Sequence, residues 1–279
     1  MIITMLSGNT MTDPSRPLSR KPNRMSLELI TIPCLTDNYA YLLHDTVTGD
    51  TALIDAPEAA PILADLKRRG WGLDQILLTH HHWDHIDGVT AIVEATSADI
   101  LGAAADAHRL PPLTRALVAG DTVQVGTHSG SVIDVPGHTI GHIAFYFADA
   151  GLVFSADSLM AGGCGRLFEG TPAQMFHSLA KLAALPPDTL VCSGHEYTTS
   201  NLRFAATIEP ENMALQTRIT ATAAARAENR PTVPSRLAEE LATNPFLRAH
   251  LPHIKAMLGM ATETDAAAFT EIRARKDTF

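Results

Sequence analysis

The sequence predicts an α/β protein in which a sheet-containing region is followed by a smaller helical region. Up to about residue 197, short runs rich in β-branched and apolar residues alternate with helical stretches. Beyond about Asn201 the strand-like runs stop, and segments rich in Ala, Leu, Glu and Arg replace them. With 279 residues, 46% of them hydrophobic, the chain is long enough for one large core and a smaller appended one.

The first region contains most of the predicted elements. Its strand-like runs are residues 27–32, 39–43, 51–55, 75–79, 131–135, 152–156 and 190–194, and its clearest helical stretch is 57–69. The second region is predicted to contain helices at 208–228, 235–243 and 264–276. The segment Asn229-Arg-Pro231 separates the first two of these helices, because proline cannot continue a helix.

Residues 1–24 differ from both regions. They contain three prolines, four basic residues and one acidic residue. We expect this extension to be disordered or to precede the true start of the protein. A targeting peptide is the alternative, although Pro14, Pro17 and Pro22 would interrupt an amphipathic helix.

Export and membrane insertion are not expected. The chain has neither a secretory signal with a cleavage site nor an apolar run of ~18 residues. Its three cysteines, Cys34, Cys164 and Cys192, are odd in number and widely spaced, which does not suggest a disulfide framework. We therefore expect a cytoplasmic protein.

The most informative segment is residues 79–85, Thr-His-His-His-Trp-Asp-His. It contains an HxHxDH cluster formed by His80, His82, Asp84 and His85. Imidazole nitrogens and carboxylate oxygens suit zinc, manganese or iron, and a catalytic site keeps one coordination position open for water. The cluster therefore predicts a binuclear metal site whose remaining ligands lie elsewhere in the chain.

Three later residues are candidates for those ligands. His138, Asp157 and His195 each follow a strand-like run, as the first cluster does. Because active sites of layered α/β proteins gather at the carboxyl ends of strands, we expect all seven side chains to converge. Taken singly, each of the three later residues is better explained as a hydrogen-bonded loop or cap residue, but their joint occurrence favours the metal site.

Three neighbouring residues are predicted to support the site without ligating a metal. His81 and Trp83 alternate with the ligands, so they should point away from the metals and pack or support the ligand residues. Asp55 stands at the end of a strand-like run, where its carboxylate could orient a ligand histidine.

These motifs resemble those of a known family. THHHWDH, then PGHTIGH at 136–142, then Asp157, then GHEYT at 194–198 resemble the metallo-β-lactamase superfamily, and within it the glyoxalase II (hydroxyacylglutathione hydrolase) family. Residues 161–170 resemble the glutathione-binding loop of that family, and residues 244–248 (NPFLR) resemble the signature of its C-terminal domain. Residues 273–279 resemble its closing RxxKDxF. The resemblance covers about residues 25–279.

The resemblance implies a fold and a ligand set. Residues 25–197 would form a catalytic domain, a four-layer αββα sandwich, and residues 198–279 a helical substrate-binding domain. Two divalent metal ions per chain are implied, zinc first and iron or manganese as alternatives. One metal would be bound by His80, His82 and His138, and the second by Asp84, His85 and His195, with Asp157 bridging the two.

The resemblance also implies a set of glutathione contacts, at Arg166, Phe168, Tyr197, Arg273 and Lys276. Arg166 stands where some members of the family carry lysine, and Phe168 where some carry tyrosine. A guanidinium still binds a carboxylate, with a different geometry, whereas phenylalanine lacks a hydroxyl hydrogen bond of roughly 1 kcal/mol.

The expected chemistry is thioester hydrolysis. Two cations about 3.5 Å apart lower the pKa of a bridging water, so a fixed hydroxide is available as nucleophile, oriented by Asp84. A thiol with a pKa near 8.5 leaves as thiolate without a general acid, whereas the amine leaving group of a peptide would need one. The resemblance thus implies hydrolysis of S-(2-hydroxyacyl)glutathione, such as S-D-lactoylglutathione, to glutathione and D-lactate, the second step of methylglyoxal detoxification.

Charge limits the partners. With 30 acidic and 21 basic residues the net charge is −9, so a nucleic-acid partner is not expected. Arg166, Arg273 and Lys276 would be local positive points that capture the carboxylates of glutathione. Without the resemblance, the last two would be explained as basic residues that favour the dipole of a terminal helix. We expect a monomer that acts on a small molecule, with no membrane partner.

The alternatives left by the sequence come mainly from the same superfamily. A persulfide dioxygenase would use a single iron and generally lacks the long helical region after Asn201. A lactonase or β-lactamase would share HxHxDH but would not explain residues 161–170 or the basic C-terminus. A non-catalytic binding module would be expected to have lost ligands, and no ligand is missing here.

Overall fold

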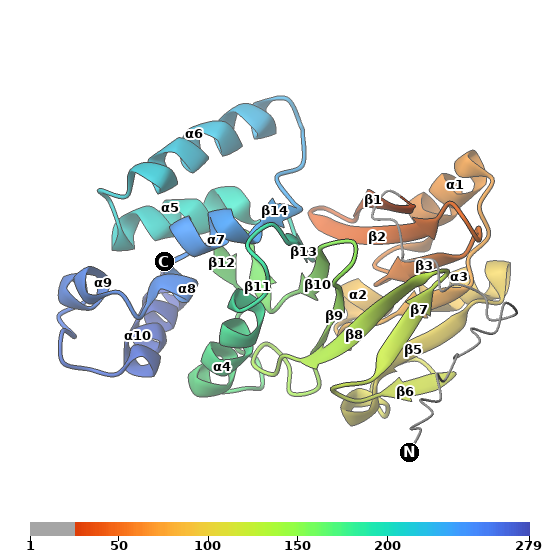
Figure 1. Cartoon of the computed structure of the whole chain (residues 1–279), viewed down its shortest axis with the longest axis horizontal. Coiled ribbons are helices and arrows are strands. Elements are labelled where there is room, and N and C mark those ends of the chain that lie inside the picture. The colour runs from red at the N-terminus through yellow and green to blue at the C-terminus, as the bar shows by residue number, and fades with distance from the viewer. Residues whose placement is uncertain (1–25) are drawn as a thin grey trace, which may run out of the picture.

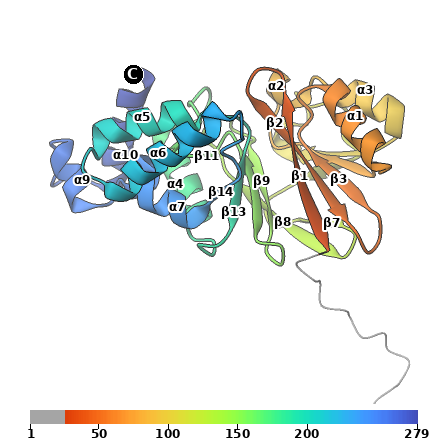
Figure 2. The ribbon, with the colours of Figure 1, turned by 90° about the horizontal axis from the view of Figure 1, so that it is seen from above.

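The computed structural model describes residues 26–279, which form two stacked six-stranded sheets with helices on both outer faces (Figures 1 and 2). The first sheet contains, in spatial order, β1 (Leu27–Cys34), β2 (Asn38–Asp45), β3 (Thr51–Ile54), β4 (Gln75–Leu77), β5 (Asp99–Ala103) and β6 (Arg115–Leu117). The second contains β14 (Ser235–Arg236), β13 (Leu190–Ser193), β10 (Leu152–Ala156), β9 (Ile143–Phe147), β8 (His128–Asp134) and β7 (Thr122–Val125). A separate hairpin pairs β11 (Leu159–Met160) with β12 (Gly163–Cys164).

Strand direction determines where side chains can meet. β1, β2 and β3 are antiparallel, whereas β3, β4, β5 and β6 are parallel. In the second sheet, β10 and β13 are parallel neighbours. Parallel strands present their carboxyl ends at one edge, so the loops after β3, β4, β10 and β13 can share one site.

Helices cover the outer face of each sheet. α1 (Ala59–Arg69) and α3 (Val89–Thr96) pack on the first sheet, where Ile62 and Ile92 join a core with Leu53 and Ile76. On the second sheet lie α4 (Pro172–Ala183), α5 (Thr198–Ile208), α8 (Pro245–Arg248) and α10 (Asp265–Asp277). The remaining helices are α2 (Trp83–Ile86), the 3₁₀ turn η1 (Ala104–Asp106), α6 (Met213–Ala227), α7 (Leu237–Thr243) and α9 (Pro252–Met257).

Aromatic side chains fill the space between the two sheets. Phe145, Phe147 and Phe154 of the second sheet are almost fully buried there, and the Tyr41 ring of β2 meets Phe154 edge-on at 5.6 Å. Each such ring buries roughly 150–250 Å². The Tyr41 hydroxyl also donates to the carbonyl of Ser193, 2.6 Å away, which ties β2 to the end of β13.

The four-layer αββα arrangement and the helical C-terminal region confirm the predicted fold class. The prediction that strands stop after Asn201 is wrong, because β14 pairs with β13 and so adds an edge strand from the second region. The helix predicted at 208–228 is present as α6 (Met213–Ala227), but it starts later than predicted. α5 ends at Ile208, and α6 starts at Met213 with the Asn212 side chain as its N-cap.

Two further points concern the chain as a whole. The extension predicted at 1–24 lies outside the described residues, and the limits given for the two domains stay a prediction. Within residues 26–279, none of the helices combines the length and the apolar character needed to cross a bilayer.

Candidate metal centre and its pocket

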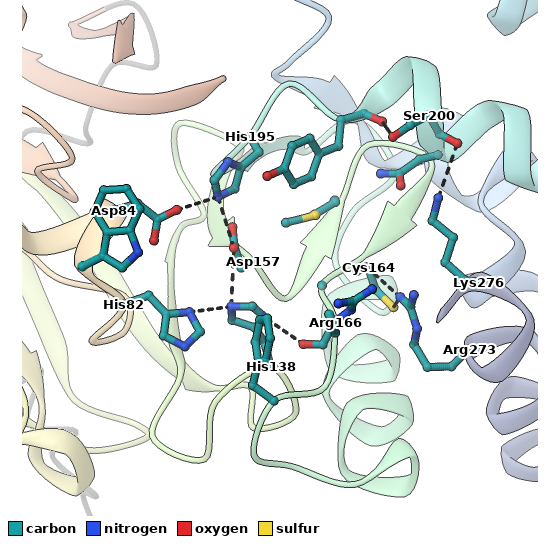
Figure 3. A pocket seen from close by; sticks show the side chains of 16 residues that line it. His82, Asp84, His138, Asp157, Cys164, Arg166, His195, Ser200, Arg273 and Lys276 are labelled. Carbon is teal, nitrogen blue, oxygen red and sulfur yellow. Dashed lines mark hydrogen bonds and ion pairs between the residues drawn. The ribbon is translucent and has the colours of Figure 1, made fainter. Parts of the chain in front are cut away.

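Four loops at one edge of the sheets bring the seven predicted ligands together, as expected from their positions after strands. The loop after β4 and the start of α2 carry His80, His82, Asp84 and His85. His138 follows β8, Asp157 follows β10 directly, and His195 follows β13. Five of the seven, His82, Asp84, His138, Asp157 and His195, line one side of a pocket, as Figure 3 shows.

The backbone around the cluster is unusual. Asp55, just after β3, and Ala156, just before Asp157, have positive φ angles of 54° and 40°. Such conformations cost about 1–3 kcal/mol for residues other than glycine and occur often at functional sites. At Gly194 a Cβ would lie 2.5 Å from Asp157 Oδ1 and 2.7 Å from His85 Cε1. The loops therefore approach one another too closely for any side chain at position 194.

His80, His82 and His138 form a first group whose ligand atoms lie within 4.8 Å of one another. The Nδ1 of His82 is 2.9 Å from the Nε2 of His138. The Nε2 of His80 is buried and has no hydrogen-bond partner.

Asp84, His85 and His195 form a second such group. The Nε2 of His195 lies 3.5 Å from Asp84 Oδ2 and 3.4 Å from His85 Nε2. Asp157 stands between the groups, since its Oδ2 is 3.3 Å from His195 Nε2 and 3.5 Å from His138 Nε2 (Figure 3). Its Oδ1 is buried without a hydrogen-bond partner.

Two carboxylates contact the Nδ1 atoms of the histidines in the second group, whose Nε2 atoms face the cluster. Asp55 Oδ2 lies 2.8 Å from His85 Nδ1, which confirms the contact proposed for Asp55 from its place at a strand end. Asp37 Oδ1 lies 3.0 Å from His195 Nδ1. A carboxylate that accepts from Nδ1–H leaves the lone pair of Nε2 free to face the cluster.

In the first group, neutral oxygen atoms contact the Nδ1 atoms of two histidines, His138 and His80. The Arg166 carbonyl oxygen is 2.7 Å from His138 Nδ1, and Thr79 Oγ1 is 3.0 Å from His80 Nδ1. The ring of the buried His142 stacks on His80 at 4.6 Å. Asp37, His142 and the Arg166 carbonyl were not predicted. Their roles arise from contacts between distant loops, for which the sequence holds no spacing signal.

Electrostatics favours the neutral, metal-binding form of the histidines in the first group. Burial and the neighbouring histidines keep the pKa of His80 well below its usual value, and burial together with His138 lowers that of His82 to about 4. Both rings are therefore neutral near pH 7, as a metal ligand requires. In the second group burial lowers the pKa of His85 and His195, but Asp157 and neighbouring carboxylates outweigh it and raise both, that of His195 to about 9. These two rings must therefore lose a proton when a metal binds. Burial alone would raise the pKa of Asp157, but His195 and His85 outweigh it and lower the pKa, so the carboxylate is ionised.

The residues present fit divalent cations. Buried polar atoms without partners are costly, and here two of them, His80 Nε2 and Asp157 Oδ1, belong to the ligand cluster. The short distance between His82 Nδ1 and His138 Nε2 likewise brings two ring nitrogens towards one point. Imidazole and carboxylate donors suit zinc, iron and manganese.

The cluster opens into a pocket of about 620 Å³. All five predicted glutathione contacts line it: Arg166, Phe168, Tyr197, Arg273 and Lys276. Phe168 packs edge-on against the rings of His82 and His138, at 5.4 and 5.3 Å, and Tyr197 stacks on His195 at 4.6 Å. Aromatic rings therefore cover the ligand histidines on the pocket side.

The cationic residues of the pocket differ in exposure. The Arg166 side chain is 60% exposed, whereas Arg273 is 5% exposed and donates to the Cys164 carbonyl oxygen (3.1 Å) and to Asp277 Oδ1 (2.9 Å). Burial, together with the charge of Arg273, lowers the pKa of Lys276. Arg273 thus anchors the loop at Cys164 in addition to lining the pocket.

The helical region also holds the hairpin that precedes Arg166. Asn244 Nδ2 donates to the carbonyl oxygens of Met160 (3.1 Å) and Gly163 (2.9 Å). Glu240, fully buried, accepts from the Gly162 N–H at 2.8 Å. The NPFLR signature therefore begins with a residue that fixes the pocket loop, and Glu240 was not predicted to take part.

The prediction for the two residues that alternate with the ligands is half right. His81 turns away from the cluster and contacts Asp106 Oδ2 at 3.0 Å. Trp83 was expected to pack, but it is 63% exposed and lines the pocket, so that expectation is wrong. The reason is that α2 begins at Trp83, and the alternation of an extended chain ends where a helix begins.

Two family models match the chain. A model for the hydroxyacylglutathione hydrolase C-terminus matches residues 196–279, and a model for the metallo-beta-lactamase superfamily matches residues 36–195. A hydroxyacylglutathione hydrolase of Cereibacter sphaeroides is 63% identical over 91% of this chain and 100% of that protein. One of a Jannaschia species is 66% identical over 90% of this chain and 98% of that protein.

Solved structures show the same fold. The BLEG-1 B3 metallo-beta-lactamase has a TM-score of 0.62 at 23% identity, over 79% of this chain and 99% of that one, which is a likeness of fold alone. A protein crystallised in a di-iron-bound form has a TM-score of 0.53 at 32% identity, over 60% of this chain and 91% of that one.

Proposed function

The chain belongs to the hydroxyacylglutathione hydrolase family of the metallo-beta-lactamase superfamily, and we propose on this basis that it hydrolyses thioesters of glutathione with 2-hydroxy acids. The proposed substrate is S-D-lactoylglutathione, and the products are glutathione and D-lactate, as in the second step of methylglyoxal detoxification. One observation carries the proposal: five residues of the ligand cluster and three cationic residues line the same pocket.

We propose two divalent metal ions per chain, zinc first and iron or manganese as alternatives. His80, His82 and His138 would hold one ion, and Asp84, His85 and His195 the other, with Asp157 in contact with both groups. When bound, such a pair of cations polarises a carbonyl group and lowers the pKa of water towards neutrality. The di-iron-bound relative supports the count of two, and so do two groups of converging ligand atoms that share no residue. A third group, Asp55, His80 and His85, takes one histidine from each of these and adds the carboxylate that contacts His85 Nδ1.

Asp84 is the proposed catalytic residue. The Asn38 side-chain amide donates to both the Asp84 carbonyl oxygen (2.9 Å) and its Oδ2 (3.2 Å), which fixes the carboxylate beside His195. In this position Asp84 can accept a hydrogen bond from the attacking water and hold its proton. The leaving thiol has a pKa near 8.5 and departs as thiolate, so no general acid is required.

The cationic residues would bind the glutathione part. Arg166, Arg273 and Lys276 form charge-assisted hydrogen bonds with the two carboxylates of the tripeptide, which orients the thioester towards the ligand cluster. Phe168 and Tyr197, which pack on the ligand histidines, would flank the thioester and limit the access of water.

The direct test compares three substrates, with and without a chelator: S-D-lactoylglutathione, glutathione persulfide and a simple lactone. Rapid, chelator-sensitive loss of the thioester, with little activity on the other two, is the expected result. Oxygen uptake on the persulfide with the thioester intact would instead indicate a persulfide dioxygenase. Preferential opening of the lactone would indicate a lactonase.

We also propose that the protein is a cytoplasmic monomer with a small-molecule partner. Its three cysteines are free and buried, as is usual in a reducing compartment. Light scattering coupled to size-exclusion chromatography tests the monomer, since a mass near twice 29.9 kDa would refute it.

A further inference from the structure

The active-site pocket has two different ends. Figure 3 shows Arg273 and Lys276 at one end, Asp157 and His138 in the middle, and Asp84 at the other end. Trp83, which directly precedes Asp84 in the chain, also lines this pocket. The indole of Trp83 therefore belongs to the end opposite to the cationic residues.

The backbone of Trp83 is fixed while its indole is exposed. Trp83 is the first residue of α2, and its carbonyl oxygen accepts from the Asp87 N–H at 2.9 Å. The residue is 63% exposed, an unusual exposure for so large an apolar side chain next to two candidate metal ligands. The other tryptophan, Trp71, is stacked on the ring of His44 at 3.9 Å.

We propose that Trp83 contacts the acyl group of the substrate and sets the acyl-group preference, an inference that rests on the proposed thioester hydrolysis. A thioester whose glutathione carboxylates lie at Arg273 and Lys276 reaches the ligand cluster with its carbonyl. Its acyl substituent must then project past the cluster, towards the end formed by Asp84 and Trp83. Phe168 and Tyr197 also expose apolar surface to the pocket, but their rings pack on His82, His138 and His195 beside the cluster. Within the described part of the chain the Trp83 indole has no such ring contact, and Trp83 directly precedes Asp84, so the indole offers apolar surface to the acyl group at that end.

The chemistry of the indole fits a 2-hydroxyacyl group. Its ring offers an apolar face for an alkyl or aryl substituent, and its N–H is a donor for a hydroxyl group. Contact with the ring removes apolar area from water, and full burial of one methylene corresponds to about a fourfold gain in kcat/KM. The preference should therefore follow the size of the acyl substituent.

The test measures kcat/KM for the S-glycolyl, S-lactoyl, S-2-hydroxybutanoyl and S-mandeloyl thioesters of glutathione. The enzymes are the metal-loaded wild type, Trp83→Ala, Trp83→Phe and, as a control, Trp71→Phe. The wild-type to Trp83→Ala ratio should be smallest for glycolyl and grow about two- to fourfold with each added carbon, within the reach of the ring. Trp83→Phe should restore much of this dependence, and Trp71→Phe should follow the wild type.

A binding measurement does not require any change at Trp83. The chain has two tryptophans, so Trp71→Phe leaves Trp83 as the only indole. Its fluorescence should shift to shorter wavelength with S-hexylglutathione, whose chain occupies the acyl position, and not with S-methylglutathione. The inhibition constant of S-methylglutathione should be the same for the wild type and Trp83→Ala, because it reports the glutathione end.

The outcomes separate the two proposals. An equal loss on all four thioesters with Trp83→Ala, or no loss at all, would refute the role of Trp83 while the thioesterase stands. Absence of a fluorescence shift with S-hexylglutathione would also refute it. Failure of the wild type to hydrolyse any of the four would refute the proposed function, and the role of Trp83 with it.

Discussion

Replacement of Asp55 by asparagine tests how the ligand histidines are held in their metal-binding form. Asp55 Oδ1 accepts from the Thr79 N–H (2.8 Å), and its Oδ2 accepts from Thr79 Oγ1 (2.7 Å) and His85 Nδ1 (2.8 Å). An amide keeps one of these oxygens and turns the other into an NH₂ donor. If the oxygen stays at the Thr79 N–H, the NH₂ faces His85, whose proton must then move to Nε2.

The expected effect is a loss of metal affinity. His85 Nε2 faces Asp157 and His195, so a proton on it blocks the lone pair that a metal needs. Removal of such a supporting group costs typically 10–100-fold in metal affinity, or about 1.4–2.7 kcal/mol. The opposite amide orientation keeps the proton on His85 Nδ1 but brings NH₂ against the Thr79 N–H, so it leaves two donors facing each other and is disfavoured.

The assay measures metal bound after desalting and in competition with a chelator. The matched control is Asp45→Asn at the end of β2, because Asp45 is also buried and accepts from Val47 N–H, Thr127 N–H and Thr127 Oγ1. Asp45→Asn should lose stability but keep the metal affinity of the wild type. Unchanged affinity in Asp55→Asn, or an equal loss in both variants, would refute the reasoning.

Three further predictions concern the helical region and its pocket. Glu240→Gln breaks the buried ion pair with Arg218 and should lower the free energy of unfolding by about 3–5 kcal/mol. Glu239→Gln removes a more exposed partner of the same arginine and should cost less than about 1 kcal/mol. Urea unfolding measures both costs, and equal costs would contradict the assignment. Lys276→Ala should raise KM about tenfold with little change in kcat, because a cation that binds a remote carboxylate of glutathione binds substrate and transition state alike. Steady-state kinetics measures both constants, and a fall in kcat with unchanged KM would contradict this prediction. Burial raises the pKa of Glu209, but hydrogen bonds from Arg248 and a neighbouring histidine outweigh it and lower the pKa. Its stabilising contribution is therefore present above the unfolded pKa of about 4.3 and is lost as pH falls through the lower folded value. Urea midpoints should show that Glu209→Gln destabilises at pH 7 and that its cost shrinks as pH falls below about 4.3, and an effect that does not depend on pH would refute it.

Local patterns were enough to predict the ligand cluster. His80, His82, Asp84 and His85 lie close in sequence and follow a recognisable strand, and β10 spans the same residues, 152–156, as its predicted run. A run of β-branched and apolar residues between turns gives a strong local signal. The arrangement of strands before the ligands was therefore predictable, while the two-sheet sandwich came from the resemblance alone.

Contacts between distant segments could not be predicted. Asp37 lies 158 residues from His195, and Glu240 lies 78 residues from Gly162, so no spacing links the members of either pair. β14 has two residues and no periodicity of its own, and it forms because β13 offers an unpaired edge. Trp83 was misjudged because the extended alternation that predicted its direction ends where α2 begins.

The central claim is that two metal ions held by this cluster are required for thioester hydrolysis. The most direct test strips the protein with a chelator, adds zinc in measured amounts and follows the rate of S-D-lactoylglutathione hydrolysis. The predicted result is negligible activity without metal and a rise that reaches its plateau at two equivalents per chain. Full activity in the stripped protein, or a plateau at one equivalent, would contradict the claim.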